Sequence, residues 1–369
     1  MFKTDKMESE GLHLRHFLDK TRMKVPIIQA GMAGGITTPE LVAAVANKGA
    51  LGTIGAGYMS ASVLQKEIQQ VKNLTDKPFA VNLFATNLEA FSTDTREMQM
   101  VLNQFRDELD IDRGSDSVKV YDYLEEKIYI ILQENIPIVS TAFGALSSVL
   151  IDRLKEKDVT LIGMATNISE AKMLAESGYD VIVAQGFEAG GHRGTFDIRK
   201  HPDGCNIGLH VLLQEMVDEI SLPVIAAGGI HTKEQIHALL SMGAAGVQLG
   251  TRFLIAKEAG TNTAYRRALM KAETEGTVIT KVFSGRPARA IQNCFVKEVE
   301  KSNCPVLPFP VQNELTKDIR AAGKDFAISD MQSLWAGQGV GAICEEESLE
   351  KIMNSLTKGF SEKVPLTDE

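Results

Sequence analysis

The architecture of this chain is most evident in residues 181–194, Val181-Ile182-Val183-Ala184-Gln185-Gly186-Phe187-Glu188-Ala189-Gly190-Gly191-His192-Arg193-Gly194. Its first four residues are apolar and indicate a buried strand, which the glycine-rich segment after them cannot continue. The chain therefore leaves the carboxyl end of a strand and enters a loop that carries one histidine. Glycine lets a backbone approach a ligand closely and present its N–H groups, which suits a phosphate or a planar ring. A surface turn is the alternative for an isolated motif of this kind.

The same rhythm of strand, loop and helix runs through most of the chain. Strands are predicted at residues 25–29, 50–54, 79–84, 136–140, 159–163, 181–185, 224–227 and 246–249. Helical segments separate them, which indicates parallel β/α units. Eight such units predict an α/β fold of the (β/α)8 TIM barrel type, in residues 1–251.

Three segments depart from this rhythm. A polar stretch at about 85–119 predicts an insertion after the third strand. Residues 252–345 predict a cap or substrate subdomain over the carboxyl end of the barrel, irregular between 276 and 339 because of its four prolines. Residues 346–369 predict a helix that returns to the barrel.

Composition excludes several classes of protein. A net charge of -9 opposes binding to nucleic acid or to anionic membranes. The apolar runs are only as long as strands, so we expect no membrane span, and the first ten residues lack an export signal. The four cysteines (Cys205, Cys294, Cys304 and Cys344) lie far apart, which indicates reduced thiols and no metal site. A cytoplasmic protein is the expectation.

Two further glycine sites follow the last two barrel strands. Gly228 and Gly229 come after residues 224–227, and Gly250 and Thr251 come after residues 246–249. In a (β/α)8 barrel these two loops usually form a phosphate site. The segment from Gly52 to Gly57 has the spacing G-x-x-G-x-G, which does not match the dinucleotide fingerprint, and there is no Walker A motif. The sequence therefore favours a ligand with one phosphate.

Several motifs together resemble one known family. They are Pro26-Ile27-Ile28-Gln29-Ala30-Gly31-Met32, Leu51 to Gly57, Gln185 to Gly194, Ala226 to Ile230, Gln248 to Thr251 and Ser284-Gly285-Arg286-Pro287-Ala288-Arg289. They are similar to those of the nitronate monooxygenases, formerly called 2-nitropropane dioxygenases. The same superfamily contains the flavin-dependent enoyl-acyl-carrier-protein reductase.

This resemblance implies an FMN-containing TIM barrel and a set of cofactor-binding residues. Asn82 and Gln185 would contact the flavin ring or ribityl chain, although an asparagine there can instead cap a turn and a glutamine can satisfy loop backbone. The full implied set is Ala30, Gly31, Met32, Asn82, Gln185, Gly190, Gly191, Gly228, Gly229, Gln248, Leu249, Gly250 and Thr251.

The resemblance also implies a reaction. A nitronate would be oxidised by dioxygen to a carbonyl compound and nitrite, with FMN supplying the electron chemistry. His192 is the expected catalytic residue, either removing the α-proton of a nitroalkane or donating a hydrogen bond to nitro or nitronate oxygens. Arg193 and Arg289 are candidates to attract an anionic substrate such as propionate 3-nitronate; the alternative is a solvated or salt-bridged arginine.

Two competing functions stay open at this stage. One is the enoyl-acyl-carrier-protein reductase with a nicotinamide donor, whose loop after the histidine usually has an apolar residue, glycine and a Thr-Thr run. This chain has Arg193-Gly194-Thr195-Phe196 there. The other is a non-catalytic flavin- or phosphate-binding regulator, against which His192 argues. The expected partners are a small nitronate and dioxygen, and a homodimer is compatible with the sequence.

Overall fold

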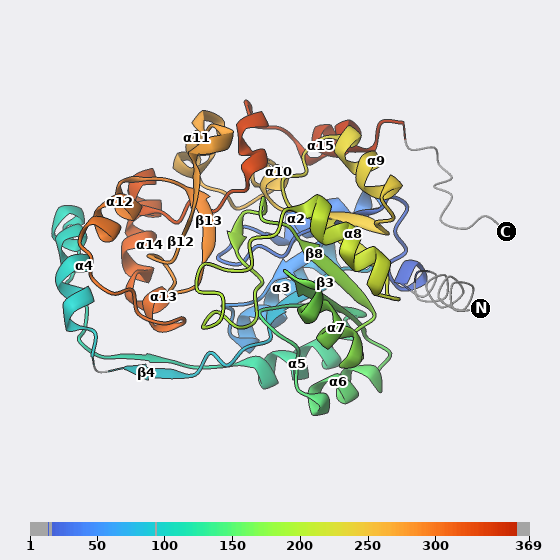
Figure 1. The fold of residues 1–369 in the computed structure, drawn as a ribbon, viewed down its shortest axis with the longest axis horizontal. Coiled ribbons are helices and arrows are strands. Elements are labelled where there is room, and N and C mark those ends of the chain that lie inside the picture. The colour runs from blue at the N-terminus through green and yellow to red at the C-terminus, as the bar shows by residue number, and fades with distance from the viewer. Residues whose placement is uncertain (1–13, 15–16, 93, 360–369) are drawn as a thin grey trace.

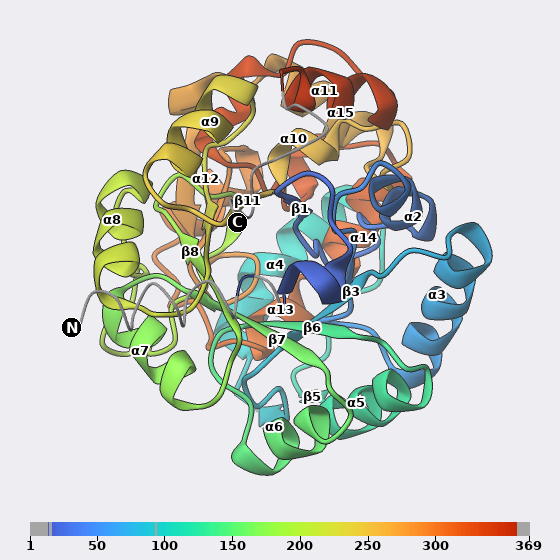
Figure 2. The same ribbon diagram turned by 90° about the vertical axis from the view of Figure 1, so that its right-hand side faces the viewer.

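Eight parallel strands form the centre of the molecule. The computed structural model describes residue 14, residues 17–92 and residues 94–359. The strands are β1 (Ile27–Gln29), β2 (Thr53–Gly55), β3 (Ala80–Phe84), β6 (Ile138–Ala142), β7 (Thr160–Ala165), β8 (Val181–Gln185), β10 (Val224–Ala227) and β11 (Gly246–Leu249). They pair in the order β1-β11-β10-β8-β7-β6-β3-β2, and a parallel bridge between Ile28 and Leu51 joins the two ends. The predicted barrel is thereby confirmed (Figure 2).

Helices surround this barrel on its outside (Figure 2). They are α2 (Pro39–Asn47), α3 (Ala61–Leu74), α5 (Leu124–Gln133), α6 (Ser148–Lys155), α7 (Ile168–Glu176), α8 (Leu209–Glu219), α9 (Lys233–Ser241) and α15 (Leu349–Thr357). Helix α3 illustrates why they lie there: it buries Leu64, Ile68 and Val71, which recur at the spacing of one helical face. Helix α15 packs against α9 and α2, in the place of the eighth barrel helix.

The two stretches that interrupt the barrel meet in a second lobe beside it (Figure 1). The first contains β4 (Ala90–Ser92), α4 (Arg96–Leu109) and β5 (Val118–Val120). The second contains α12 (Cys294–Lys301), α13 (Val311–Leu315) and α14 (Lys317–Asp325). Side chains of both, among them Leu102, Phe105, Phe295 and Ile319, bury one another in a hydrophobic cluster. The expectation of irregular structure at 276–339 was therefore wrong: prolines divide the segment into short elements, and partners distant in sequence stabilise these.

A small antiparallel sheet joins this lobe to the barrel. Its strands are β12 (Thr277–Thr280), β13 (Ala288–Ile291) and β9 (Gly191–His192), in the order β12-β13-β9. His192 lies opposite Ala288 in the register of this sheet. The histidine that follows β8 is thus held by a strand of the second lobe. The remaining elements are α10 (Thr251–Leu254), α11 (Thr263–Lys271), η1 (Thr274–Gly276), η2 (Ser329–Met331) and η3 (Gln338–Ala342).

Among the helices that the structure describes, none has both the length and the apolar character needed to span a membrane. The same residues contain no group of three or more His, Cys, Asp or Glu side chains that could hold a metal ion. Cys205, Cys294, Cys304 and Cys344 are free thiols.

Candidate active site

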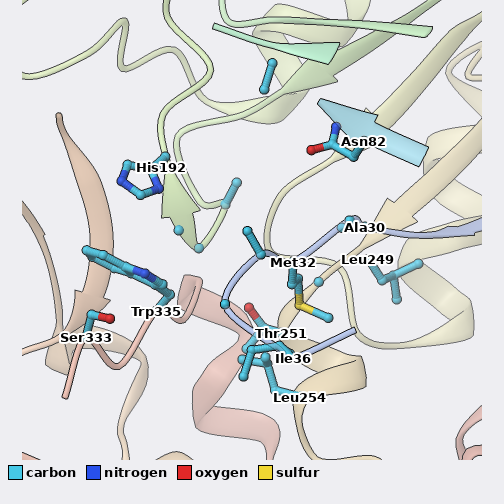
Figure 3. Close-up of a pocket in the computed structure, with 18 of the residues that line it drawn as sticks. Ala30, Met32, Ile36, Asn82, His192, Leu249, Thr251, Leu254, Ser333 and Trp335 are labelled. Atoms are coloured by element: carbon cyan, nitrogen blue, oxygen red, sulfur yellow. The ribbon is translucent and has the colours of Figure 1, made fainter. Parts of the chain in front are cut away.

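A cavity of about 450 Å³ opens at the carboxyl ends of the barrel strands, between the barrel and the second lobe. This volume lies in the range of small-molecule sites, about 300–1,000 Å³. His192 and Trp335 lie on one side of it, and Ala30, Leu249 and Asn82 on the other (Figure 3). Every residue predicted for the site lines this cavity: Ala30, Gly31, Met32, Asn82, Gln185, Gly190, Gly191, His192, Gly228, Gly229, Gln248, Leu249, Gly250 and Thr251.

One end of the cavity presents backbone N–H groups that have no partner. The N–H groups of Gly228, Gly229, Gly250 and Thr251 donate no hydrogen bond to any described residue. Gly228 and Gly229 have φ values of 129° and 67°, which an L side chain rarely adopts. Free N–H groups from adjacent loops, one of them at the start of α10, form the kind of cradle that holds a phosphate. These residues fit the phosphate of FMN.

Gln185 and Gly190 line the cavity and also stabilise the loop that follows β8. The Gln185 side chain donates to the carbonyl of His192 at 3.0 Å and accepts from the N–H of Gly194 at 2.8 Å, so it fixes the loop after β8. A Cβ on Gly190 would lie 2.3 Å from the nitrogen of Gly337, so close packing of the Trp335–Gly337 segment requires glycine there. These two hydrogen bonds match the alternative reading of Gln185, in which the side chain satisfies the backbone of the loop.

Asn82 is oriented by a neighbouring strand. Its Nδ2 donates to the hydroxyl of Ser140 on β6 at 2.9 Å. The side chain therefore does not cap a turn, and its Oδ1 accepts no hydrogen bond from a described residue. Asn82 is the middle residue of β3, and an amide held this way suits contact with a planar ring in the cavity.

His192 lies in an aromatic enclosure. Its ring centroid is 5.2 Å from that of Trp335, 5.7 Å from that of Phe143 and 6.2 Å from that of Phe309. Its Nε2 lies 2.8 Å from the hydroxyl of Ser284. Burial, followed by the positive charges of Arg286 and Arg320, lowers the pKa of His192 to about 3. The imidazole is therefore neutral near pH 7 and can accept a proton or take part in hydrogen bonds.

Neither of the arginines considered from the sequence lines the cavity. The Arg193 guanidinium is fully buried and donates to the carbonyls of Gly186, Gln185 and Cys205. Arg289 donates to the carbonyl of Phe187 and lies 4.2 Å over the ring of that residue. Their positions favour neither reading considered from the sequence, attraction of substrate or a solvated or salt-bridged group, because both guanidinium groups bind backbone carbonyls inside the protein.

Of the four lysine and arginine residues that line the cavity, three come from helix α14, and the fourth, Arg252 of α10, forms an ion pair with Glu347 at 2.5 Å. Lys317, Arg320 and Lys324 are spaced by three and four residues and share one face of the helix. Arg320 is held by Thr316 and Asn313 through Nε and Nη2, and its Nη1 has no partner among the described residues. The helical spacing of these residues can be read from the sequence. Nothing near them in the sequence indicates that this face of α14 lines a cavity of the barrel, whose last strand ends more than sixty residues earlier.

Tyr58 is a second lining residue that the sequence did not single out. Its ring packs edge-on against Phe84, with centroids 5.1 Å apart. The Tyr58 side chain is 40% exposed, and the protein around it raises the pKa of the phenol, although Arg320 and Arg286 lower it. The phenol is therefore protonated near pH 7 and can donate a hydrogen bond to an anion in the cavity.

Comparison with known proteins gives a consistent result. Residues 15–359 match the family model described as Nitronate monooxygenase. A probable nitronate monooxygenase of Staphylococcus saprophyticus is 39% identical over 317 residues, which are 86% of this chain and 89% of the relative. A nitroalkane oxidase of Streptomyces ansochromogenes aligns with a TM-score of 0.86 and 34% identity, covering 93% of this chain and 96% of the other. FabK of Thermotoga maritima aligns with a TM-score of 0.73 and 27% identity, covering 93% and 94%. The chain belongs to the nitronate monooxygenase family.

Proposed function

We propose that this enzyme binds FMN and uses dioxygen to oxidise alkyl nitronates, such as propionate 3-nitronate, to a carbonyl compound and nitrite. The observation that carries the proposal is the composition of one cavity. It combines free backbone N–H groups for a phosphate, a neutral imidazole and the cations of α14. A nitronate is an anion, and these groups attract and orient an anion.

FMN, when bound, supplies the electron transfer from the nitronate and the reaction with dioxygen. The backbone donors at Gly228, Gly229, Gly250 and Thr251 would hold its phosphate, and Asn82 would contact its ring or ribityl chain. The residues of this chain then have two tasks. Arg320 and Tyr58 bind the negatively charged nitro group or a second anionic group of the substrate. The aromatic side chains around His192 exclude water from the place where a proton is held or moved.

The competing enoyl reductase is less favoured, because the relatives at 39% and 34% identity are named as a nitronate monooxygenase and a nitroalkane oxidase, whereas FabK aligns at 27% identity and a lower TM-score. A regulator without catalysis would have no need of a neutral imidazole enclosed in the cavity. The cytoplasmic location and a homodimer belong to the same proposal and are checked by fractionation and by analytical ultracentrifugation.

The proposal is tested by measuring the turnover of a neutral nitroalkane and of a preformed nitronate by the variant His192→Asn. His192→Asn keeps a hydrogen-bonding amide but cannot accept a proton, so we expect it to purify yellow with FMN. Its turnover of neutral nitroethane should fall by about 100-fold or more, the usual contribution of general base catalysis. Its turnover of preformed ethyl nitronate should fall much less. Nitrite release and oxygen uptake measure both reactions. Folded protein that does not bind FMN would refute the cofactor, and equal activity of variant and parent on both substrates would refute the role of His192.

A further inference from the structure

Ser284 is the only described residue that makes a hydrogen bond to the ring of His192. It lies in the loop between β12 and β13 and is 1% exposed. The loop is fixed on both sides: Gln312 donates to the carbonyl of Val282, and Thr316 donates to the carbonyl of Phe283. The hydroxyl is therefore held in place by the second lobe, while β9 holds the imidazole.

The Ser284 hydroxyl has three neighbours and a single proton. Its Oγ lies 2.8 Å from Nε2 of His192, 3.1 Å from the carbonyl oxygen of Arg286 and 3.3 Å from the N–H of Arg286. The N–H of Arg286 can only donate, and the carbonyl can only accept. The remaining question is whether the hydroxyl donates to the carbonyl or to the imidazole.

One assignment satisfies every group. If the hydroxyl donates to the carbonyl of Arg286, it accepts from the N–H of Arg286 and from Nε2–H of His192. If it donates to Nε2 instead, the Arg286 carbonyl loses its partner, because no other described hydrogen bond reaches it and the residue is 3% exposed. An unpaired buried carbonyl is unfavourable enough to shift this equilibrium by about tenfold or more.

The other ring nitrogen is then the one available to a ligand. Nδ1 of His192 has no hydrogen-bond partner among the described residues, and the ring lines the cavity. Trp335, Phe143 and Phe309 pack around the ring, and its hydrogen bond to Ser284 favours the orientation in which Nε2 faces the loop. Burial and the positive charges of Arg286 and Arg320 lower the pKa of His192, which favours the neutral ring, in which one nitrogen carries a proton and the other a lone pair.

We propose that Ser284 is a positioning residue that holds His192 in the Nε2–H tautomer and leaves the Nδ1 lone pair as the proton acceptor of the cavity. The consequence rests on the proposed function. The Cα–H bond of a neutral nitroalkane breaks, its proton forms a bond with Nδ1, and the electron pair moves onto the nitro group to give the nitronate. Nε2–H continues to donate to Ser284, whose oxygen stabilises the positive charge that the ring has gained.

The tautomer is measured without turnover. The full chain, loaded with its flavin and labelled with ¹⁵N-histidine, is studied by two-bond ¹H–¹⁵N correlation, and the signals of His192 are assigned by their loss in His192→Asn. We expect a neutral ring protonated at Nε2 in the parent. Ser284→Ala should raise the share of the Nδ1–H form by about tenfold. Ser284→Thr, which keeps the hydroxyl, should retain the parent spectrum. A parent ring protonated at Nδ1 would overturn the proposal, even if neither variant folds.

Kinetics separate positioning from a general loss of structure. Ser284→Ala should lower kcat/KM for neutral nitroethane by about 10- to 100-fold, mostly in kcat, and that for ethyl nitronate by less than about threefold. Ser355→Ala on α15 removes a serine hydroxyl that also donates to a backbone carbonyl, and it should change neither value. An equal loss on both substrates would contradict the proposal. An enzyme that oxidises no nitronate would refute the proposed function and leave the tautomer measurement standing.

Discussion

Replacement of Arg106 by methionine should destabilise the second lobe and weaken substrate binding together. Arg106 lies on α4, in the insertion after β3, and its side chain is 1% exposed. It donates to both carboxylate oxygens of Asp318 on α14, at 2.7 and 3.2 Å, and to the carbonyl of Leu315 at 2.6 Å. Gln99 and Asn103 accept its remaining N–H groups at 2.7 and 3.0 Å. All five donors of the guanidinium are therefore used: two stay on α4 itself, and three fix α13 and α14 against it.

The size of the effect follows from these contacts. Removal of one partner from a buried ion pair costs about 3–5 kcal/mol. The Asp318 side chain is 45% exposed, so water can solvate its carboxylate after the change and the lower end of that range applies. The carbonyl of Leu315 loses a buried donor, at about 1–3 kcal/mol, and burial of the methionine side chain recovers a similar amount. We therefore expect a loss of about 3 kcal/mol in the free energy of unfolding.

Urea unfolding followed by the fluorescence of Trp335 measures this loss, because Trp335 is the single tryptophan and its ring lies 5.5 Å from that of Phe283 in the lobe. The matched control is Arg113→Met, which removes a bidentate pair with Asp107 whose side chains are 68% and 51% exposed. That change should leave the free energy of unfolding nearly unchanged, because water and salt screen an exposed ion pair. Since α14 carries Lys317, Arg320 and Lys324, the KM for a nitronate should rise several-fold in Arg106→Met. A loss below about 1 kcal/mol with an unchanged KM would refute the reasoning.

Two further predictions concern the cavity. Arg320→Gln should lower kcat/KM for anionic nitronates by about tenfold, mainly through KM, whereas for neutral nitroethane the loss should fall mainly on kcat, because that anion forms only within the cavity. The parent's kcat/KM for nitronates should also fall with added salt, and no salt dependence would mean that α14 does not attract the anion. Gly228→Ala, at a φ of 129°, should raise the Kd for FMN by about tenfold in a flavin-fluorescence titration, because the strain of an L residue there is of order 1 kcal/mol or more. Gly276→Ala, where a Cβ meets nothing within 4 Å, should leave that Kd unchanged.

The barrel could be predicted because each of its strands and helices is specified by residues that are close together in the sequence. Each barrel strand is a short apolar run that ends in a polar or glycine loop, and each helix has an apolar face, so the alternation alone specifies parallel β/α units. Residues on these strands and in the loops at their carboxyl ends, such as Asn82, Gly228 and Thr251, then converge by topology. No knowledge of their long-range contacts was needed to bring them to one cavity.

The second lobe and the charged residues were not predictable in the same way. Arg106 and Asp318 are 212 positions apart, and nothing near either residue indicates that they meet. The contacts of Arg193 and Arg289 could not be predicted for a related reason: arginine is usually exposed or paired with a carboxylate, and only the folded loop supplies the carbonyls that satisfy a buried guanidinium. Ser284 belongs to a motif that the sequence analysis identified, but its contact with His192 depends on the pairing of β13 with β9, which the sequence does not indicate.

His192 belongs to both parts of the molecule, and this has a consequence for specificity. The barrel loop after β8 supplies the residue, but β13 pairs with it, Ser284 of the neighbouring loop binds its ring, and Trp335 and Phe309 enclose it. The cations of α14 come from the same lobe, which α4 holds in place through Arg106. The cofactor-binding residues, in contrast, belong mostly to the barrel. Changes in the lobe can therefore alter which substrates are accepted and how protons are handled, while the barrel preserves the site for the flavin.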